Sequence, residues 1–478
     1  MSIIDVPIED HESYRNELAS ISIDGRRKWI YARQPNGKYT RSRAIVATIL
    51  LAFLAISPFV KVHGHQFMLL NIMERQFVFF GLPFWPNDFY LVALVFITVV
   101  ITLVVSTAIV GRIWCGWLCP QTIFLEFIFR RIEWWIDGTP VQQAQRRSGP
   151  WNTDRIWRTT LKQSIFFAIS FAIANIFLAY LISSDRLLLY ITEGPGHHAA
   201  ILFPLTAFTF VFYAVFARFR EQACLIVCPY GRYMSSLVDD NTITVTYDTT
   251  RGEHRGKFTK ADKEAWHAGQ ARPEGKGDCV DCHQCVTVCP TGIDIRNGIQ
   301  LECVACTACI DACDEVMEKV GRPKGLIRYT SATAVKNSVA KVCTTRIKAY
   351  VAVWVLLLIA VIVLFSLREM LDVLVLRQEG TTWVKTPQGV ANFYRMQIIN
   401  KSDDELPVEL VAVEPANAII TPIESFEVIH GGHIAKGRFI VTIPGADGMQ
   451  GAMPITISIR SNGREVKSVT TSFIGGSL

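Results

Sequence analysis

Five apolar stretches, each long enough to cross a lipid bilayer as a helix, constrain this chain of 478 residues more than any other feature. Half of the residues are hydrophobic, which is more than a water-soluble domain needs to fill its core. We therefore predict an α-helical membrane bundle of five spans. The predicted spans are residues 44–62, 89–110, 161–182, 199–219 and 349–367.

The basic residues beside these stretches predict their orientation, because short loops rich in Lys and Arg stay in the cytoplasm. Seven Lys and Arg residues precede the first stretch, over 26–43, and only Arg75 lies in the loop 63–87. Seven Lys and Arg residues follow the second stretch, over 111–160. Only Arg186 lies in the loop 183–198 after the third. The N-terminus and residues 218–348 are therefore expected in the cytoplasm, and the C-terminus outside it.

Two further features of composition narrow the class of protein. The net charge of +6 is small, and the basic residues lie near the apolar segments and form no single stripe. Nucleic-acid binding is therefore not expected. Residues 1–25 are polar and acidic without an apolar core, so no cleavable signal peptide is expected there.

Eight of the thirteen cysteines form two copies of the spacing Cys-x2-Cys-x2-Cys-x3-Cys, as CVDCHQCVTVC and CVACTACIDAC. With this spacing, three thiolates of one copy hold one [4Fe–4S] cluster and the fourth reaches the neighbouring cluster. We therefore predict two [4Fe–4S] clusters. The expected ligands are Cys279, Cys282, Cys285 and Cys313 for the first cluster, and Cys303, Cys306, Cys309 and Cys289 for the second.

A zinc ribbon is the alternative, since Cys-x2-Cys pairs also suit tetrahedral zinc. Four evenly spaced cysteines, repeated, exceed what zinc requires. The module resembles bacterial ferredoxins with two [4Fe–4S] clusters over about residues 277–317. Asp314 stands where a proline usually follows the fourth cysteine, a change that removes no ligand.

Two shorter motifs, both Cys-x3-Cys-Pro, follow the second and fourth apolar stretches. They contain Cys115, Cys119, Cys224 and Cys228. At the spacing i and i+4, each pair is expected to present both sulfurs on one helix face just inside the cytoplasmic boundary. If the two helix ends pack together, four thiolates converge and could hold a further iron–sulfur cluster, bind Cu(I) or act as redox thiols. The simpler alternative is that these cysteines pack as small apolar side chains.

Arg112 and Arg220 lie beside these motifs. They either stabilise thiolates or clusters by their charge, or mark the cytoplasmic side as basic flanking residues.

The outer loops contain side chains that could receive copper or haem iron: His63, His65, Met68, His197 and His198. Solvated or interfacial histidines are the simpler interpretation. Each pair of spans carries two of these histidines and one Cys-x3-Cys-Pro motif, which indicates an internal repeat.

Three other segments have patterns of their own. Residues 122–136 place aromatic and charged side chains on different faces, which predicts a helix lying in the membrane interface. Residues 239–277 are charged and weakly periodic, as in a linker. In residues 373–478, apolar and polar residues alternate in short runs that are separated by turn residues. This pattern predicts a β-sandwich.

The order of these parts resembles the FixG/RdxA/CcoG family of cytochrome oxidase accessory proteins over nearly the whole chain. The resemblance depends on GRIWCGWLCPQTIF, on QACLIVCPYGRYM, on the double-cluster module, and on the last span with its outer β-domain. Polyferredoxins of nitrate and nitrous-oxide respiration are similar over the first 320 residues, and the C-terminal domain separates them from this chain.

The resemblance implies a role in assembling cbb3-type cytochrome c oxidase by reducing Cu(II) to Cu(I), which makes the protein a cupric reductase. It also implies an immunoglobulin-like fold for the β-domain and a multi-pass location in a bacterial inner membrane. Lipid, an electron donor, and oxidase assembly factors or copper carriers are the implied partners. Thiolates bind Cu(I) better than Cu(II), so the four cysteines of the Cys-x3-Cys-Pro motifs are the expected catalytic residues. The alternatives are a quinol-linked electron conduit to another respiratory enzyme, and a redox sensor or scaffold.

The chain is therefore expected to have several domains. They are a cytoplasmic N-terminal segment (1–43), a four-span core (44–238), a cytoplasmic linker with the ferredoxin-type module (239–348), a fifth span (349–367) and a periplasmic immunoglobulin-like domain (368–478).

Overall fold

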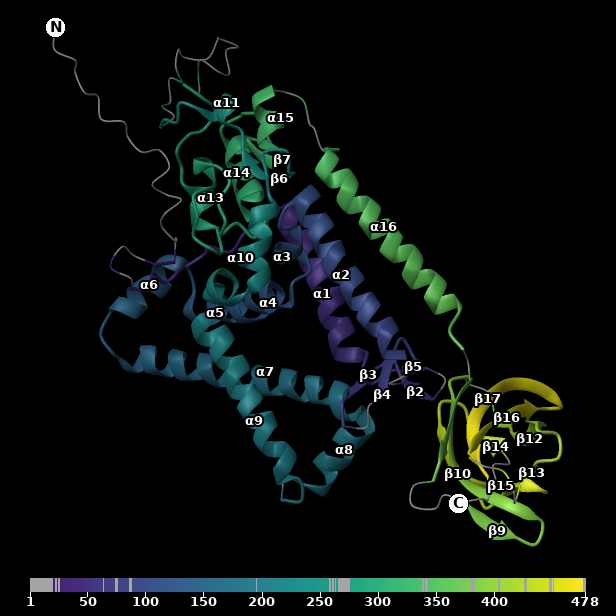
Figure 1. The fold of residues 1–478 in the computed structure, drawn as a ribbon. Helices are drawn as coiled ribbons and strands as arrows, with labels where there is room; N and C mark the ends of the chain where they lie inside the picture. Colours follow the sequence, from purple (N-terminus) through teal and green to yellow (C-terminus); the bar gives the residue numbers. More distant parts are fainter. Residues whose placement is uncertain are drawn as a thin grey trace. The chain divides into compact units, whose positions relative to one another are not determined.

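The computed structural model of the chain consists of two compact units (Figure 1). The first is formed by Met1–Val60 and Val92–Val361, and the second by Lys61–Leu91 and Ile362–Leu478. The structure describes residues 20, 21, 24, 26–62, 64–73, 76–85, 88–194, 196–257, 259, 262, 264, 276–337, 339, 343–369, 371–378, 383–402, 405–424, 428–446, 449 and 451–475.

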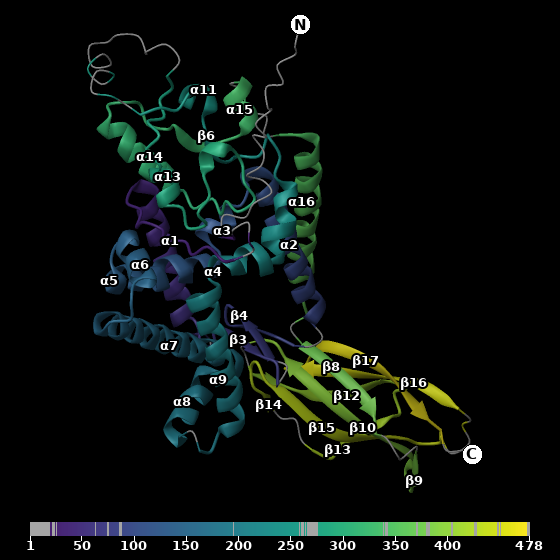
Figure 2. The ribbon, with the colours of Figure 1, turned by 90° about the vertical axis from the view of Figure 1, so that its left-hand side faces the viewer.

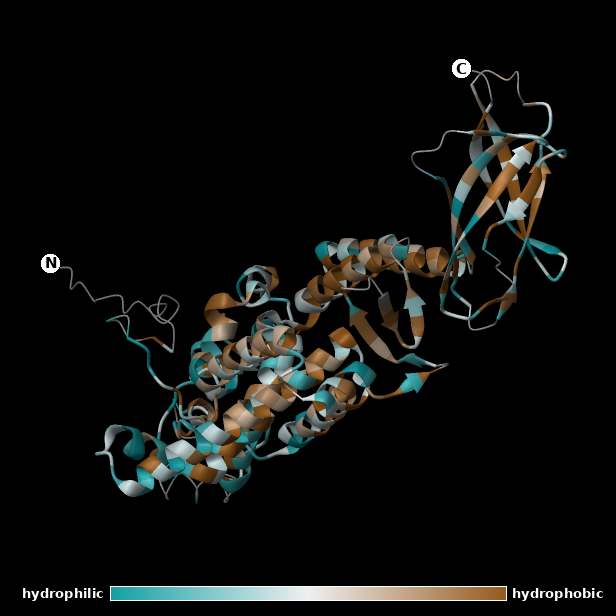
Figure 3. Cartoon of the chain, turned by 90° about the horizontal axis from the view of Figure 1, so that it is seen from below, coloured by the Kyte–Doolittle hydropathy of each residue, from teal (hydrophilic) through white to brown (hydrophobic). Residues whose placement is uncertain are grey.

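Among the described residues, five helices are long and apolar enough to span a membrane, as predicted. They are α1 (Lys38–Ile56), α2 (Phe89–Val110), α7 (Thr153–Ile182), α9 (Ala199–Ala214) with its continuation η4 (Val215–Phe219), and α16 (Thr345–Ser366). Their surfaces are strongly apolar, as the brown helices of Figure 3 show. Leu356 of α16 and Phe203 of α9, for example, are 69% and 79% exposed. Helices with such surfaces satisfy their own backbone and suit a lipid environment.

Three predicted spans have different bounds in the structure. The first was expected at 44–62, but α1 begins earlier and ends at Ile56, because Pro58 has no N–H with which to continue it. The third was expected at 161–182, but α7 begins at Thr153, where the Asn152 side chain accepts a hydrogen bond from the Arg155 N–H at 2.9 Å. The fifth was expected at 349–367, but α16 begins at Thr345 and ends at Ser366.

Short helical segments follow α2 and α9 at their predicted cytoplasmic ends. After α2 they are α3 (Ile113–Trp117), α4 (Pro120–Ile123), η3 (Phe124–Phe129), α5 (Arg130–Asp137) and α6 (Pro140–Ser148). After η4 they are η5 (Ala223–Val227), α10 (Pro229–Tyr233) and η6 (Met234–Leu237). Helix α8 (Ser184–Glu193) lies in the predicted second outer loop. The segments η3, η4 and η5 are π-helical, a conformation frequent at functional sites.

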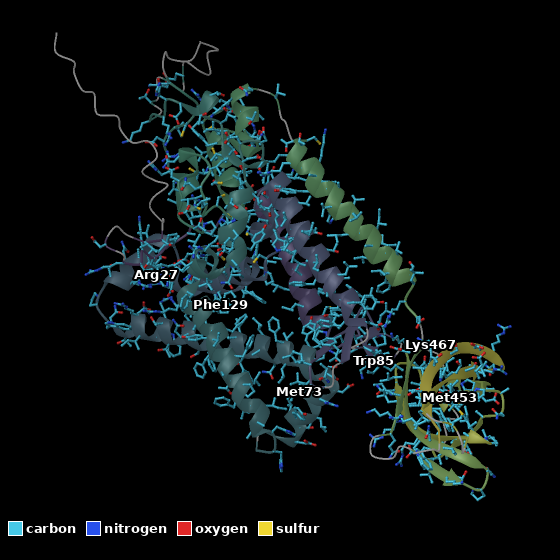
Figure 4. The ribbon with its side chains drawn as sticks, viewed as in Figure 1. Arg27, Met73, Trp85, Phe129, Met453 and Lys467 are labelled. Atoms are coloured by element: carbon cyan, nitrogen blue, oxygen red, sulfur yellow. The ribbon has the colours of Figure 1, made fainter. Side chains whose placement is uncertain are left out.

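The predicted interface helix at 122–136 is helical, but of its charged side chains only Arg131 is exposed. Arg130 is 1% exposed and Glu133 6%. Arg130 pairs with Glu126 at 2.5 Å, and Arg220 pairs with Glu133 at 2.6 Å. Beside them, Phe129 (labelled in Figure 4) lies within a buried aromatic cluster. The charges are buried because each has a partner of opposite sign, which a helical periodicity cannot show.

The cysteine-rich module belongs to the first unit (Figure 2). Strand β6 (Thr244–Tyr247) pairs antiparallel with β7 (Ile327–Thr330). The helices of the module are α11 (Thr249–Gly252), α13 (Gln284–Thr287), η7 (Ile295–Asn297), α14 (Ala308–Lys319) and α15 (Ala332–Asn337). The prediction of a linker at 239–277 is wrong for its first part, because Val245 and Tyr247 of β6 lie in the core of the module.

In the described residues, the predicted all-β domain consists of two larger sheets and a separate two-stranded one. One has the strand order β13 (Ile419–Pro422), β15 (Ile434–Ile443), β10 (Gly389–Asn400), β8 (Leu371–Arg377), with β9 (Val384–Thr386) also on β10. The other has the order β12 (Glu409–Glu414), β16 (Ala452–Ser461), β17 (Arg464–Ile474), and β11 (Leu406–Pro407) pairs with β14 (Val428–Ile429). Alternate side chains such as Tyr394, Phe439, Ile457 and Phe473 are buried in one shared core.

The first outer loop, for which no strands were predicted, forms part of the same unit as this domain. Its strands are β1 (Lys61–Val62), β2 (His65–Gln66), β3 (Met68–Asn71), β4 (Gln76–Phe79) and β5 (Leu82–Phe84). Asp88, 3% exposed, accepts hydrogen bonds from Arg368 at 2.9 Å and Lys401 at 2.6 Å. A buried carboxylate with two cationic partners ties the loop to the domain.

Candidate metal centres

Two cavities in the module are lined by cysteines, four in the first and five in the second. The first cavity is lined by Cys279, Cys282, Cys285 and Cys313, and the second by Cys289, Cys303, Cys306 and Cys309. The two cavities are similar in size, and Cys285 also lines the second. The structure therefore brings together each of the two predicted sets of four, and it places the sets side by side.

The backbone wraps around the two cavities in the same way. In the first copy of the motif, Asp281 and His283 have φ values of 50° and 54°. At the equivalent positions of the second copy, Ala305 and Thr307 have φ values of 52° and 63°. Residues other than glycine rarely adopt this left-handed conformation, so its repetition marks a loop shaped around a site.

The chemistry of the two cavities fits a [4Fe–4S] cluster in each. Burial raises the pKa of Cys285 to about 12 and that of Cys306 to about 11, so deprotonated thiols there need a compensating positive charge. Among the described residues, no three His, Cys, Asp or Glu side chains are placed to hold a single metal ion. Four thiols around a wider space suit a larger iron–sulfur group better than one zinc ion.

The first cavity reaches the protein surface at Cys282. This is the one exposed cysteine of the eight, all of which the structure describes. Cys282 also lines a polar groove with Arg33, Gln284 and Lys319. Asp314, the departure from the ferredoxin pattern, accepts a hydrogen bond from the Gly325 N–H at 2.8 Å.

The two Cys-x3-Cys-Pro motifs have the same local structure, which differs from the predicted one. The expectation that both cysteines of a pair lie on one continuous helix is wrong. Cys119 and Cys228 are extended, with ψ values of 124° and 115°, because each precedes a proline that begins a new helix. Each donates its N–H to the carbonyl five residues earlier, at 2.9 Å.

The four thiols of these motifs nevertheless gather at one place. The pKa of Cys224 is raised to about 12 by burial and by the nearby thiols of Cys119, Cys115 and Cys228. Cys115 packs in one buried cluster with Cys306 of the second cavity. We call this group of four the membrane-edge thiols.

Close backbone contacts hold the membrane-edge thiols against the second cavity. A Cβ on Gly116 would lie 2.6 Å from the carbonyl oxygen of Val304, so only glycine fits there. Arg43 of α1 donates to the Gly116 carbonyl at 2.9 Å. The Trp117 indole lies 3.3 Å from the Tyr329 hydroxyl, which in turn donates to the Ala305 carbonyl.

Only one of the two arginines beside the motifs faces these thiols. Arg112 is buried, donates to the Leu301 carbonyl and hydrogen-bonds Cys115, where it opposes the effect of burial on the pKa of that thiol. Arg220 instead pairs with Glu133 and lies over the Trp29 ring at 4.9 Å.

Two residues near the cysteines were not predicted from the sequence. Asp311 is buried between two cysteines of the second motif copy and accepts hydrogen bonds from the backbone of Tyr39 and Thr40 at 3.1 and 2.7 Å. Tyr230 follows the second Cys-Pro, and its hydroxyl lies 2.8 Å from that of Thr107. The adjacency of each to a cysteine motif was the only available signal.

The other candidate residues have separate environments. His63 lies outside the described residues, and His65 and Met68 lie on β2 and β3. His197 lies in the turn before α9, and His198 is engaged by Glu193 at 2.6 Å and by the Tyr190 ring. Cys343 is exposed ahead of α16.

Three protein-family models match the chain. Residues 219–332 match a 4Fe-4S dicluster domain, and residues 92–138 match a 4Fe-4S binding domain. Residues 361–476 match a domain described as an IG-like fold at the C-terminal of FixG. The immunoglobulin-like fold expected for the C-terminal domain is thereby confirmed.

The chain is also similar to named bacterial proteins over most of its length. It is 32% identical to Protein RdxA of Cereibacter sphaeroides over 79% of this chain and 80% of that protein. It is 30% identical to the nitrogen fixation protein FixG of Rhizobium meliloti, over 80% and 79% respectively. It is 31% identical to Protein RdxB of C. sphaeroides, over 90% and 88%. A crystal structure of a FixG-related protein from Vibrio parahaemolyticus aligns with 23% of this chain and 98% of its own, at 13% identity and a TM-score of 0.19.

Proposed function

This chain belongs to the FixG/RdxA family of iron–sulfur membrane redox proteins, and from that premise we propose that it passes single electrons to copper. In this proposal Cu(II) takes up one electron and becomes Cu(I), which is then supplied for assembly of a cbb3-type cytochrome c oxidase. The electron comes from a one-electron donor in the cytoplasm or from a membrane quinol.

The gathering of the membrane-edge thiols beside the second cavity is the observation that carries this proposal. Soft thiolate ligands bind Cu(I) more tightly than Cu(II), so such a group favours the reduced ion. Arg112, hydrogen-bonded to Cys115, offsets part of the negative charge that deprotonated thiols bring together.

The protein's own residues hold, space and shield the redox groups. The eight cysteines of the two cavities would hold two [4Fe–4S] clusters, which supply one-electron redox chemistry when bound. Apolar side chains such as Val245, Ile293 and Ile295 line the second cavity and exclude water from it. At the first cavity, exposed Cys282 makes the adjoining groove the natural place for the donor to approach.

The test compares the anaerobically purified full chain with two variants, Cys115→Ala and Cys224→Ala. After reduction with dithionite and anaerobic removal of the excess reductant, we expect the unchanged protein to abolish the EPR signal of a substoichiometric amount of added Cu(II). Each variant should keep about eight irons per chain, from two [4Fe–4S] clusters, but leave the Cu(II) signal in place. Cys343→Ala is the matched control, since Cys343 is exposed and belongs to neither group.

A variant that reduces Cu(II) as fast as the unchanged chain would contradict the proposed role of the membrane-edge thiols. Zinc in place of iron would contradict the assignment of the two cavities.

A further iron–sulfur cluster on the same four thiols is a second candidate for this site. It is favoured by the match of residues 92–138, which include Cys115 and Cys119, to a 4Fe-4S binding model. Under this alternative the unchanged chain contains about twelve irons, and Cys115→Ala lowers the number to about eight.

A further inference from the structure

Three histidines of the second unit lie at one turn. Two of them belong to the turn, and the third is distant in sequence. His430 and His433 lie on the turn between β14 and β15, with ring centroids 6.3 Å apart. A Cβ built on Gly432, between them, would lie 2.2 Å from Nε2 of His65. The imidazole of His65, from β2 of the outer loop, therefore lies directly against this turn.

The turn is built so that this approach is possible. Gly432 has a φ of +68° and is buried, so a side chain there would be strained and would also collide with His65. Its N–H donates to the Ser402 carbonyl at 3.0 Å, and the His433 carbonyl accepts from the Asn400 N–H at 3.2 Å. The side chains of His430 and His433 remain exposed beside the half-buried ring of His65.

A carboxylate orients one of the three rings. Nδ1 of His430 lies 2.7 Å from a carboxylate oxygen of Glu405. Such a contact favours the tautomer that carries its proton on Nδ1 and leaves Nε2 as a free electron-pair donor. Histidines that bind metal ions commonly have a carboxylate partner of this kind on the other ring nitrogen.

We propose that His65, His430 and His433 form a binding site for Cu(II) on the second unit. Imidazole nitrogens suit late divalent metal ions, and copper binds most tightly of the first-row series. In the structure without metal, the three rings do not converge on one ion position, so the exposed rings of His430 and His433 turn toward the ion as it binds and complete a site with the ring of His65. The choice of copper as cargo rests on the proposed function, whereas the site itself rests on the three histidines.

This site and the membrane-edge thiols have opposite preferences. A site of neutral imidazoles retains the oxidised ion, whereas thiolates favour the reduced one. The histidine site is therefore expected to hold Cu(II) and not Cu(I).

The test measures Cu(II) binding to the full chain with its clusters oxidised, in a Cys115→Ala, Cys224→Ala background. Binding there requires no reduction, so a failure of the histidine site is distinguished from a failure of the proposed function. We expect one Cu(II) per chain, with nitrogen hyperfine structure in its EPR spectrum. His430→Ala and His433→Ala should each weaken binding by about tenfold or more, and Glu405→Gln by about tenfold.

His198→Ala is the matched control, because that outer histidine is already engaged by Glu193 and Tyr190. It should bind Cu(II) as tightly as the background protein. Unchanged affinity in both His430→Ala and His433→Ala would overturn the proposal, and both side chains are exposed. His65→Ala then shows whether the outer loop contributes the third nitrogen, with an expected weakening of about tenfold or more.

Discussion

At the scale of single residues, burial disfavours the charged form of the cysteine thiols unless a metal is bound. Burial raises the pKa of Cys115, and burial with three neighbouring thiols raises that of Cys224 to about 12. A raised pKa means that the neutral thiol dominates at neutral pH. Metal binding must therefore release protons from these cysteines.

The raised pKa of Cys224 predicts how it reacts with iodoacetamide in protein stripped of metal by a chelator. Only the thiolate reacts, so its rate of alkylation should rise about tenfold per pH unit from pH 8 toward the pKa near 12. Mass spectrometry of the labelled peptides measures this rate, with exposed Cys343 as the reference for access. Alkylation of Cys224 that no longer rises above pH 9 would contradict the prediction, and labelling in denaturant gives the unfolded limit.

At the scale of elements, a side chain of the cysteine module caps the first membrane helix. Gly37, which precedes α1, has no side chain to accept a hydrogen bond from the first turn. Asp311 of α14 takes this role, with Oδ2 accepting from the N–H and the hydroxyl of Thr40, both at 2.7 Å. A Cβ on Gly37 would lie 2.3 Å from the Asp311 carboxyl carbon. The membrane helix and the module are therefore held together at an otherwise uncapped helix end.

Asp311→Ala removes this cap without touching a cysteine. We expect it to destabilise the contact by about 1–2 kcal/mol, as for the loss of other helix caps, and to lower the temperature at which the visible absorbance of the clusters is lost. Asp311→Asn keeps an accepting oxygen and should lose less. Glu315→Ala is the control on the same helix, because its ion pair with Lys319 is exposed and contributes little. Equal melting of Asp311→Ala and Glu315→Ala would refute the capping role.

At the scale of the whole molecule, the predicted outer loop and the C-terminal domain are expected on the same side of the membrane. They form one compact unit in which Asp88 binds Arg368 and Lys401. The distribution of Lys and Arg predicts that this side is the outer one. The packing of two segments so distant in sequence agrees with an odd number of spans between an N-terminus expected in the cytoplasm and a C-terminus expected outside it.

Labelling of intact cells with a membrane-impermeant maleimide tests this orientation. Met73, labelled in Figure 4, is 92% exposed on the outer loop, and Val466 is 44% exposed on the domain. In single variants Met73→Cys and Val466→Cys, the new thiol should react in intact cells. Native Cys343, exposed ahead of α16, should react only after the cells are permeabilised. The reverse pattern would show that the predicted orientation is wrong.

The sequence by itself determined the features that depend on neighbouring residues. Apolar length predicted five spans, because a bilayer sets the number of residues in a crossing helix. Alternating runs predicted the all-β domain, because side chains of a strand point to opposite faces in turn. Cysteine spacing predicted the two sets of four that line the cavities, since the fourth cysteine of each copy lies on the following turn.

Only the tertiary structure decided which distant residues meet. It brought the two Cys-x3-Cys-Pro motifs together, positioned Asp311 as the N-terminal cap of α1, and placed His65 against Gly432. It also buried Arg130 and Glu133 with partners, where their spacing had indicated a solvated face. Such contacts depend on the packing of segments far apart in the chain. Periodicity and local spacing along the sequence therefore do not predict these long-range contacts.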